Sequence, residues 1–116
     1  MDGLTSGAVD YDSRVRGTGV ETDPEAAAVA LEQVCDALSA CRMDAGEQVS
    51  VCSVTDSDGA CVETSSTFGR ELVFLQSHTV HHAAMIRAIL AAAGVEVPAE
   101  FGLAPATIAQ ARRGES

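Results

Sequence analysis

The chain has 116 residues, enough for one domain with a modest core and too few for two. The chain has 17 acidic residues and only seven basic ones, all arginine. The formal net charge of -10 disfavours nucleic acid or an anionic membrane as a partner. No apolar run reaches the roughly 18 to 20 residues of a membrane span, and the N-terminus lacks a signal-like segment, so we expect a cytoplasmic protein.

Residues 1–22 are rich in glycine, aspartate, serine and threonine without a hydrophobic period, which predicts a loop or linker. A helix is predicted over residues 23–42. Asp23 can cap its first turn, Pro24 suits the first helical position, and Glu25 complements the helix dipole. The apolar positions of this helix recur at steps of three and four residues: Ala27, Leu31, Val34, Leu38 and Cys41.

Residues 47–63, EQVSVCSVTDSDGACVE, predict two short extended segments around a turn at the Asp-Gly pair 58–59. The four cysteines of the chain form no C-x-x-C pair and lack zinc-ribbon spacing, so we expect free, reduced thiols. A two-residue turn at 58–59 places Cys61 opposite Asp56, which disfavours a disulfide between Cys61 and Cys52.

The longest and most hydrophobic helix is predicted over residues 66–93. Gly94 suits the left-handed residue that often ends a helix, and Pro98 lies just beyond it. A short helix is predicted over residues 105–113.

All three histidines lie on the long helix, in the stretch SHTVHH. At about 100° per residue, His78 and His82 lie about 40° apart on a largely apolar face, which we expect to point inward. His81 lies at the border of that face, and we expect it to line a pocket or pack. Gln76 and Arg87 fall on the opposite face, which we expect to be the polar exterior. The inward face also carries Glu71, Leu75, Met85 and Ile89.

Imidazoles at positions i and i+4 of one helical face can direct their ring nitrogens at a single cation, as in zinc and nickel sites. The alternative is a pair of core histidines that only satisfy hydrogen bonds. A catalytic metal site usually takes three protein ligands. Glu71 lies roughly 10 Å along the axis from His78, which favours a role for Glu71 at the helix dipole. The pattern therefore predicts His78 and His82 as ligands and leaves the third unassigned.

The stretch GRELVFLQSHTVHHAAMIRAILAAAGVEVPAEFGLAPAT, residues 69–107, resembles the C-terminal half of the DinB/YfiT-like superfamily of helical bundles. The weaker DYDSRVRGTGVETD, residues 10–23, is similar to the linker between the first and second helices of that family. The resemblance implies an all-α fold, namely an incomplete DinB-like bundle of about three helices with a short β-hairpin or irregular insertion between the middle helices. Residues 1–116 would then form a single truncated domain without the first helix of the family.

The resemblance further implies a divalent metal, zinc or nickel, held by His78 and His82 with a third histidine from the missing helix. His81 would line the pocket. The activity implied is that of a metal-dependent thiol transferase or hydrolase acting on a small thiol or another small molecule.

A second hypothesis is a truncated, non-catalytic helical module that self-associates, for example as a homodimer. A bundle that lacks one helix leaves an apolar groove, and the long helix offers a second small apolar stripe of Val73, Val80 and Ala84. The same stripe is also compatible with an ordinary core. The metal content of the purified protein would distinguish the two hypotheses.

Overall fold

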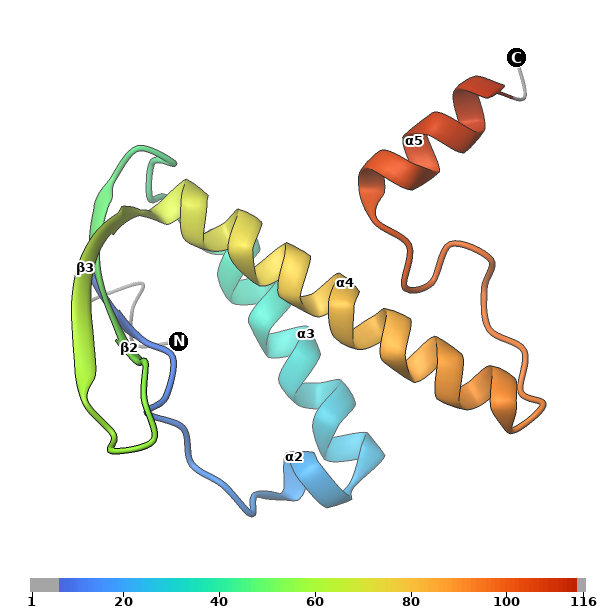
Figure 1. The fold of residues 1–116 in the computed structure, drawn as a ribbon, viewed down its shortest axis with the longest axis horizontal. Coiled ribbons are helices and arrows are strands. Elements are labelled where there is room, and N and C mark those ends of the chain that lie inside the picture. The colour runs from blue at the N-terminus through green and yellow to red at the C-terminus, as the bar shows by residue number, and fades with distance from the viewer. Residues whose placement is uncertain (1–6, 115–116) are drawn as a thin grey trace. The chain divides into compact units, whose positions relative to one another are not determined.

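The computed structural model describes residues 7–114 and contains a three-stranded sheet and four helices in that range (Figure 1). In chain order the elements are β1 (Ala8–Asp10), α2 (Gly19–Thr22), α3 (Pro24–Ala40), β2 (Gln48–Val54), β3 (Cys61–Thr67), α4 (Phe68–Ala92) and α5 (Pro105–Gly114). The chain comprises two compact units, residues 1–70 and 71–116, so that the division falls within the first turn of α4.

The all-α class was wrong, because three strands within residues 8–67 form a mixed sheet with the order β1-β2-β3. β1 pairs with β2 in parallel, and Val9 lies opposite Val51. β2 pairs with β3 in antiparallel fashion over seven residues each, from the pair of Gln48 with Thr67 to the pair of Val54 with Cys61. The predicted hairpin is therefore not an insertion in a helical bundle but the larger part of the sheet.

The strands form because residues 48–54 alternate between two environments. Val49 and Val51 are 4% and 6% exposed, and they are the buried apolar side chains of the described residues. Ser50, between them, points to the other face, where its hydroxyl donates a hydrogen bond to Glu63 Oε1 at 2.5 Å. One buried face and one polar face are what a half-covered antiparallel pair requires.

The connection between β2 and β3 is a loop of residues 55–60 and not the two-residue turn that we predicted. Asp56 organises this loop, because its Oδ1 accepts hydrogen bonds from the amides of Asp58 at 3.0 Å and Ala60 at 3.2 Å. Gly59 adopts the left-handed conformation with φ +80°. An aspartate that caps its own turn in this way is a common alternative to a tight hairpin.

The first long helix, α3, begins where local chemistry indicated. Asp23 is its N-cap, with Oδ1 accepting a hydrogen bond from the Glu25 amide at 2.9 Å, and Pro24 occupies the first turn. The predicted cap is thus confirmed. The apolar stripe of α3 is largely exposed, with Leu31 at 66% and Leu38 at 41%.

The second long helix, α4, follows β3 directly and ends before Gly94, which has φ +72° as a C-terminal left-handed residue. Of the two residues that we expected on its polar exterior, Gln76 is exposed and Arg87 is not. Arg87 is half-buried, and its Nη1 donates hydrogen bonds to the carbonyl oxygens of Ala99 at 2.8 Å and Phe101 at 3.1 Å. The segment after α4 therefore folds back onto the side of the helix that carries Arg87, and the expectation of an exposed Arg87 was wrong.

Candidate functional site

The histidines of α4 form a compact aromatic group. The Nε2 atoms of His78 and His82 lie 3.0 Å apart, and their ring centroids are 4.5 Å apart at an interplanar angle of 81°. The His81 ring lies 5.6 Å from the His82 ring and 6.4 Å from the His78 ring. Phe74 stacks on His78 with a centroid distance of 5.9 Å. The i, i+4 spacing thus brings the two ring nitrogens together, as the helical geometry predicts.

These histidines are exposed and do not lie in a core. The apolar side chains of the same face are exposed as well, with Leu75 at 46%, Met85 at 51% and Ile89 at 66%. Glu71, at the start of this face, is the exception and is only 6% exposed.

The part of the chain that the structure describes contains no group of three or more histidine, cysteine, aspartate or glutamate side chains that could hold a metal ion. A pair of nitrogens lacks the further donors that zinc and nickel sites require. The prediction of a metal-binding helical bundle with zinc or nickel was therefore wrong for this range. The separate assignments of a ligand role to His78 and His82 and of a pocket-lining role to His81 stay predictions.

A pocket that the sequence did not reveal lies where α3 ends. It has a volume of about 390 Å³ and is open to solvent. The connection that follows α3 is fixed by hydrogen bonds from the Gly69 amide to the Ala45 carbonyl at 2.8 Å and from the Phe68 amide to the Glu47 carbonyl at 2.9 Å. The pocket is lined by Ala37, Ala40, Cys41, Arg42, Met43 and Glu47.

Alanine and methionine give the pocket a mainly apolar wall, and Arg42 and Glu47 add one charge of each sign. Its volume is near the lower end of the roughly 300–1,000 Å³ that is usual for ligand pockets. The sequence signal that could have located it is the Asp-Ala-Gly turn after the helix. There the Asp44 Oδ1 accepts a hydrogen bond from the Gly46 amide at 3.1 Å and turns the chain toward β2.

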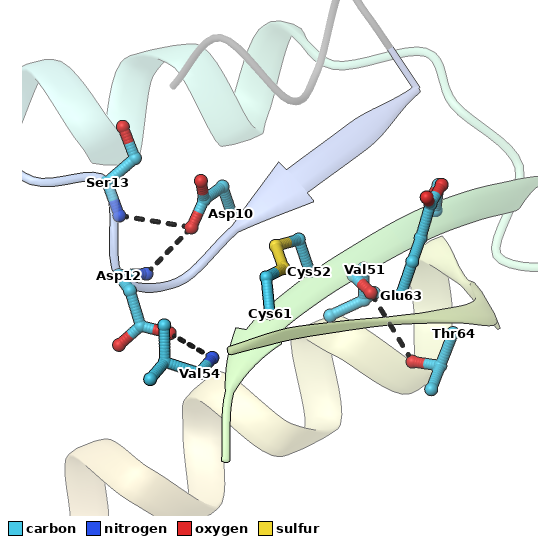
Figure 2. Close-up of a disulfide and its surroundings, with 10 residues drawn as sticks. Asp10, Asp12, Ser13, Val51, Cys52, Val54, Cys61, Glu63 and Thr64 are labelled. Carbon is cyan, nitrogen blue, oxygen red and sulfur yellow. Dashed lines mark hydrogen bonds between the residues drawn. A yellow bond between two sulfur atoms is a disulfide. The ribbon is translucent and has the colours of Figure 1, made fainter. Parts of the chain in front are cut away.

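A disulfide joins Cys52 of β2 to Cys61 of β3, with the Cα atoms 6.0 Å apart (Figure 2). The expectation of free thiols for this pair was wrong because the register differs from that of a two-residue turn. The longer loop places Cys61 opposite Val54 and Cys52 opposite Glu63, so the two cysteines are diagonal neighbours on one face of the sheet. Cys35 and Cys41 are free thiols.

The strand end that carries Cys52 is also held by the segment after β1. Asp12 Oδ2 accepts a hydrogen bond from the Val54 amide at 2.7 Å, and the Tyr11 amide donates to the Cys52 carbonyl at 3.4 Å. Asp10 Oδ1 accepts from the amides of Asp12 and Ser13 and so fixes the turn that presents Asp12 (Figure 2).

No family model matches the chain, and no solved structure matches it. The chain is similar to a protein of Rhizopus delemar named FK506-binding protein 5, with 34% identity over 103 residues. The match covers 86% of this chain and 26% of that protein. The chain therefore spans about a quarter of the length of the curated relative that it matches.

The assignment to the DinB/YfiT-like superfamily was wrong, because the similarity is to a protein named for FK506 binding and the chain contains a sheet. The resemblance rested mainly on residues 69–107, which are helices and their connection, whereas the strands lie in residues 8–67. The two functional hypotheses were therefore wrong as well. These were the metal-dependent thiol transferase or hydrolase and the truncated helical module that oligomerises.

The remaining predictions are not tested by these findings. Self-association, a small thiol or other small-molecule partner, the exclusion of nucleic acid and membrane, and a bound divalent metal stay predictions. Within residues 7–114, no helix combines the length and the apolar character that crossing a membrane would need. The cytoplasmic location stays a prediction.

Proposed function

We propose that this chain is an FK506-binding domain with peptidyl-prolyl isomerase activity. The observation that carries the proposal is the similarity to FK506-binding protein 5, at 34% identity over 86% of this chain. Because the match covers 26% of that protein, the proposal concerns what this chain binds by itself.

The pocket at the end of α3 is the proposed binding site. Its apolar side chains, Ala37, Ala40 and Met43, suit a prolyl ring or the apolar part of a macrocyclic ligand. Glu47 and Arg42 offer an acceptor and a donor for the polar groups of such a ligand. The open mouth lets a ligand larger than about 390 Å³ insert one group and leave the remainder outside.

Prolyl isomerisation is compatible with the chemistry of this pocket. Rotation about an Xaa–Pro bond breaks no covalent bond, so it needs neither a nucleophile nor a metal ion. Its barrier is that of the partial double bond of the amide. A site that binds the twisted amide better than the planar one lowers that barrier. An apolar wall favours the twisted form, because the twisted amide has less charge separation than the planar one.

The test is calorimetric titration of the full chain with FK506, together with an isomerisation assay on an Xaa–Pro peptide. Saturable binding, and isomerisation that FK506 inhibits, would support the proposal. Absence of saturable heat at a protein concentration of about 100 µM would exclude affinities in the micromolar range and overturn it.

A matched pair of variants locates the site. Ala40→Leu fills the pocket, whereas Ala28→Leu makes the same change at another exposed position of α3 outside it. We expect Ala40→Leu to weaken FK506 binding at least tenfold and Ala28→Leu to leave it unchanged. Equal affinities for the two variants would place the ligand elsewhere and contradict the assignment of this pocket.

A further inference from the structure

We propose that the disulfide between Cys52 and Cys61 is a redox-sensitive clamp, which a dithiol reductant opens to release the hairpin loop, residues 55–60, and the strand ends beside it. This device lies outside the pocket proposed for ligand binding and does not depend on that proposal. It rests on the position of the bridge, on its exposure and on the charge around it.

The bridge stands at the end of the β2–β3 ladder that the loop 55–60 connects. The pair of Val54 with Cys61 is the last of the ladder, and beyond it the Thr55 amide reaches the Ala60 carbonyl at 3.4 Å. Side-chain burial adds little here, since the first five residues of β3 are exposed and Val62 is 46% exposed. The covalent link therefore acts here together with hydrogen bonds, those that Asp56 accepts within the loop and the one that Asp12 accepts from the Val54 amide.

Charge opposes closure of the same end. Residues 55–63 include three carboxylates and no arginine, lysine or histidine. Asp56 and Asp58 lie in the hairpin loop, and Glu63 pairs with Cys52 across the ladder. The Asp12 carboxylate lies at the same end, where it accepts a hydrogen bond from the Val54 amide at 2.7 Å. Like charges that share one end of a sheet repel one another, so the hairpin end should loosen when the bridge is cut.

The chemistry is ordinary thiol–disulfide exchange. Cys61 is exposed and Cys52 is half-buried, which makes the Sγ of Cys61 the accessible sulfur. A thiolate of the reductant attacks that sulfur, the bond to Cys52 breaks, and Cys52 leaves as a thiolate that takes up a proton. The second thiol of the reductant then attacks the mixed disulfide and releases Cys61. Two electrons pass to the protein, which gains two thiols, and the dithiol becomes a disulfide.

Hydrogen bonds connect the bridged end of β2 to the segment after β1. The Cys52 carbonyl accepts from the Tyr11 amide, and the Val54 amide donates to Asp12. When β3 frays, residues 52–54 lose their support on one side and these two hydrogen bonds weaken. Opening the clamp should therefore expose amides in two stretches distant in sequence, around residue 12 and from residue 53 to residue 63.

Differential alkylation of the full chain tests whether the bridge exists and opens. In air-oxidised protein, only Cys35 and Cys41 should react with an alkylating reagent under denaturing conditions, and after treatment with dithiothreitol all four cysteines should react. Alkylation of Cys52 and Cys61 in the oxidised, untreated protein would overturn the proposal.

Hydrogen–deuterium exchange tests whether reduction of the disulfide opens the hairpin end. Reduction should speed exchange of peptides covering residues 53–63 at least tenfold, whereas peptides from α3 should not change. The variant Cys61→Ser should exchange fast with or without reductant, and Cys35→Ser should respond like the wild type. Unchanged exchange in residues 53–63 after verified reduction would show that the bridge is no clamp.

Discussion

The close approach of Gly102 to α4 gives the sharpest stability prediction. A Cβ atom at Gly102 would lie 2.8 Å from both the Cα and the N of Ala84, and Gly102 has φ +75°. The variant Gly102→Ala therefore combines two penalties, a left-handed backbone that alanine adopts poorly and a clash with main-chain atoms that cannot rotate away. Gly94→Ala is a natural control, since Gly94 has φ +72° and a Cβ atom added there would meet nothing within 4 Å.

The free-energy cost of each penalty can be estimated separately. A left-handed alanine costs about 1–2 kcal/mol, and the loss of glycine entropy in the unfolded chain returns about 0.4–1 kcal/mol. Gly94→Ala should therefore lower the free energy of unfolding by about 1 kcal/mol. Overpacking adds about 1–3 kcal/mol, so Gly102→Ala should lose about 2–4 kcal/mol.

Urea denaturation followed by far-ultraviolet circular dichroism measures both losses. With a slope of about 1–3 kcal/mol per molar urea, Gly102→Ala should shift the midpoint by on the order of 1–3 M. The shift for Gly94→Ala should be clearly smaller. Equal losses in the two variants would refute the view that Gly102 is required for the approach of the C-terminal segment to Ala84.

Three further changes test other parts of the structure by the same denaturation assay. Cys61→Ser, under non-reducing conditions, should lower the free energy of unfolding by about 2.6 kcal/mol for a ring of this size, since the cysteines are nine residues apart. Cys35→Ser should leave it unchanged, and equal stability of the two variants would contradict the bridge. Asp23→Ala removes the cap of α3 and should cost about 1 kcal/mol, with a loss of helical signal. Asp36→Ala, exposed within the same helix, should cost nothing, and an equal loss in both would show that the cap contributes little. Arg87→Ala removes two solvent-exposed hydrogen bonds to backbone carbonyls and should cost about 0.5–1.5 kcal/mol, because water can replace the lost donor. No loss in this variant would mean that the segment after α4 is held by packing alone.

The ends of the helices were the predictable part of the fold, because their signals are local. Asp23 and Pro24 mark the start of α3 within two residues, and the left-handed Gly94 follows the end of α4. The approach of the His78 and His82 nitrogens is equally local, since it depends only on the pitch of one helix.

The sheet and the covered face of α4 were not predictable in this way. β1 has three residues, too few for a pattern, and it joins the sheet through pairing with residues about 40 positions later. The periodicity of α4 separates two faces but does not say which one is covered. That choice is made by Gly102 and Arg87, which bring the following segment onto one side of the helix. The disulfide was missed because we assumed a two-residue turn between β2 and β3, which gives a different pairing of Cys61 from the observed pairing with Val54.

The parallel pairing of β1 with β2 has a consequence for the order of folding. Ala8 pairs with Ser50, so this contact closes a loop of about 40 residues, whereas β2 and β3 are joined by a short loop. The entropy lost on loop closure grows with loop length, and local contacts form sooner than distant ones. The hairpin of β2 and β3 should therefore assemble early, and β1 should dock as the last strand once α3 has formed between them in sequence.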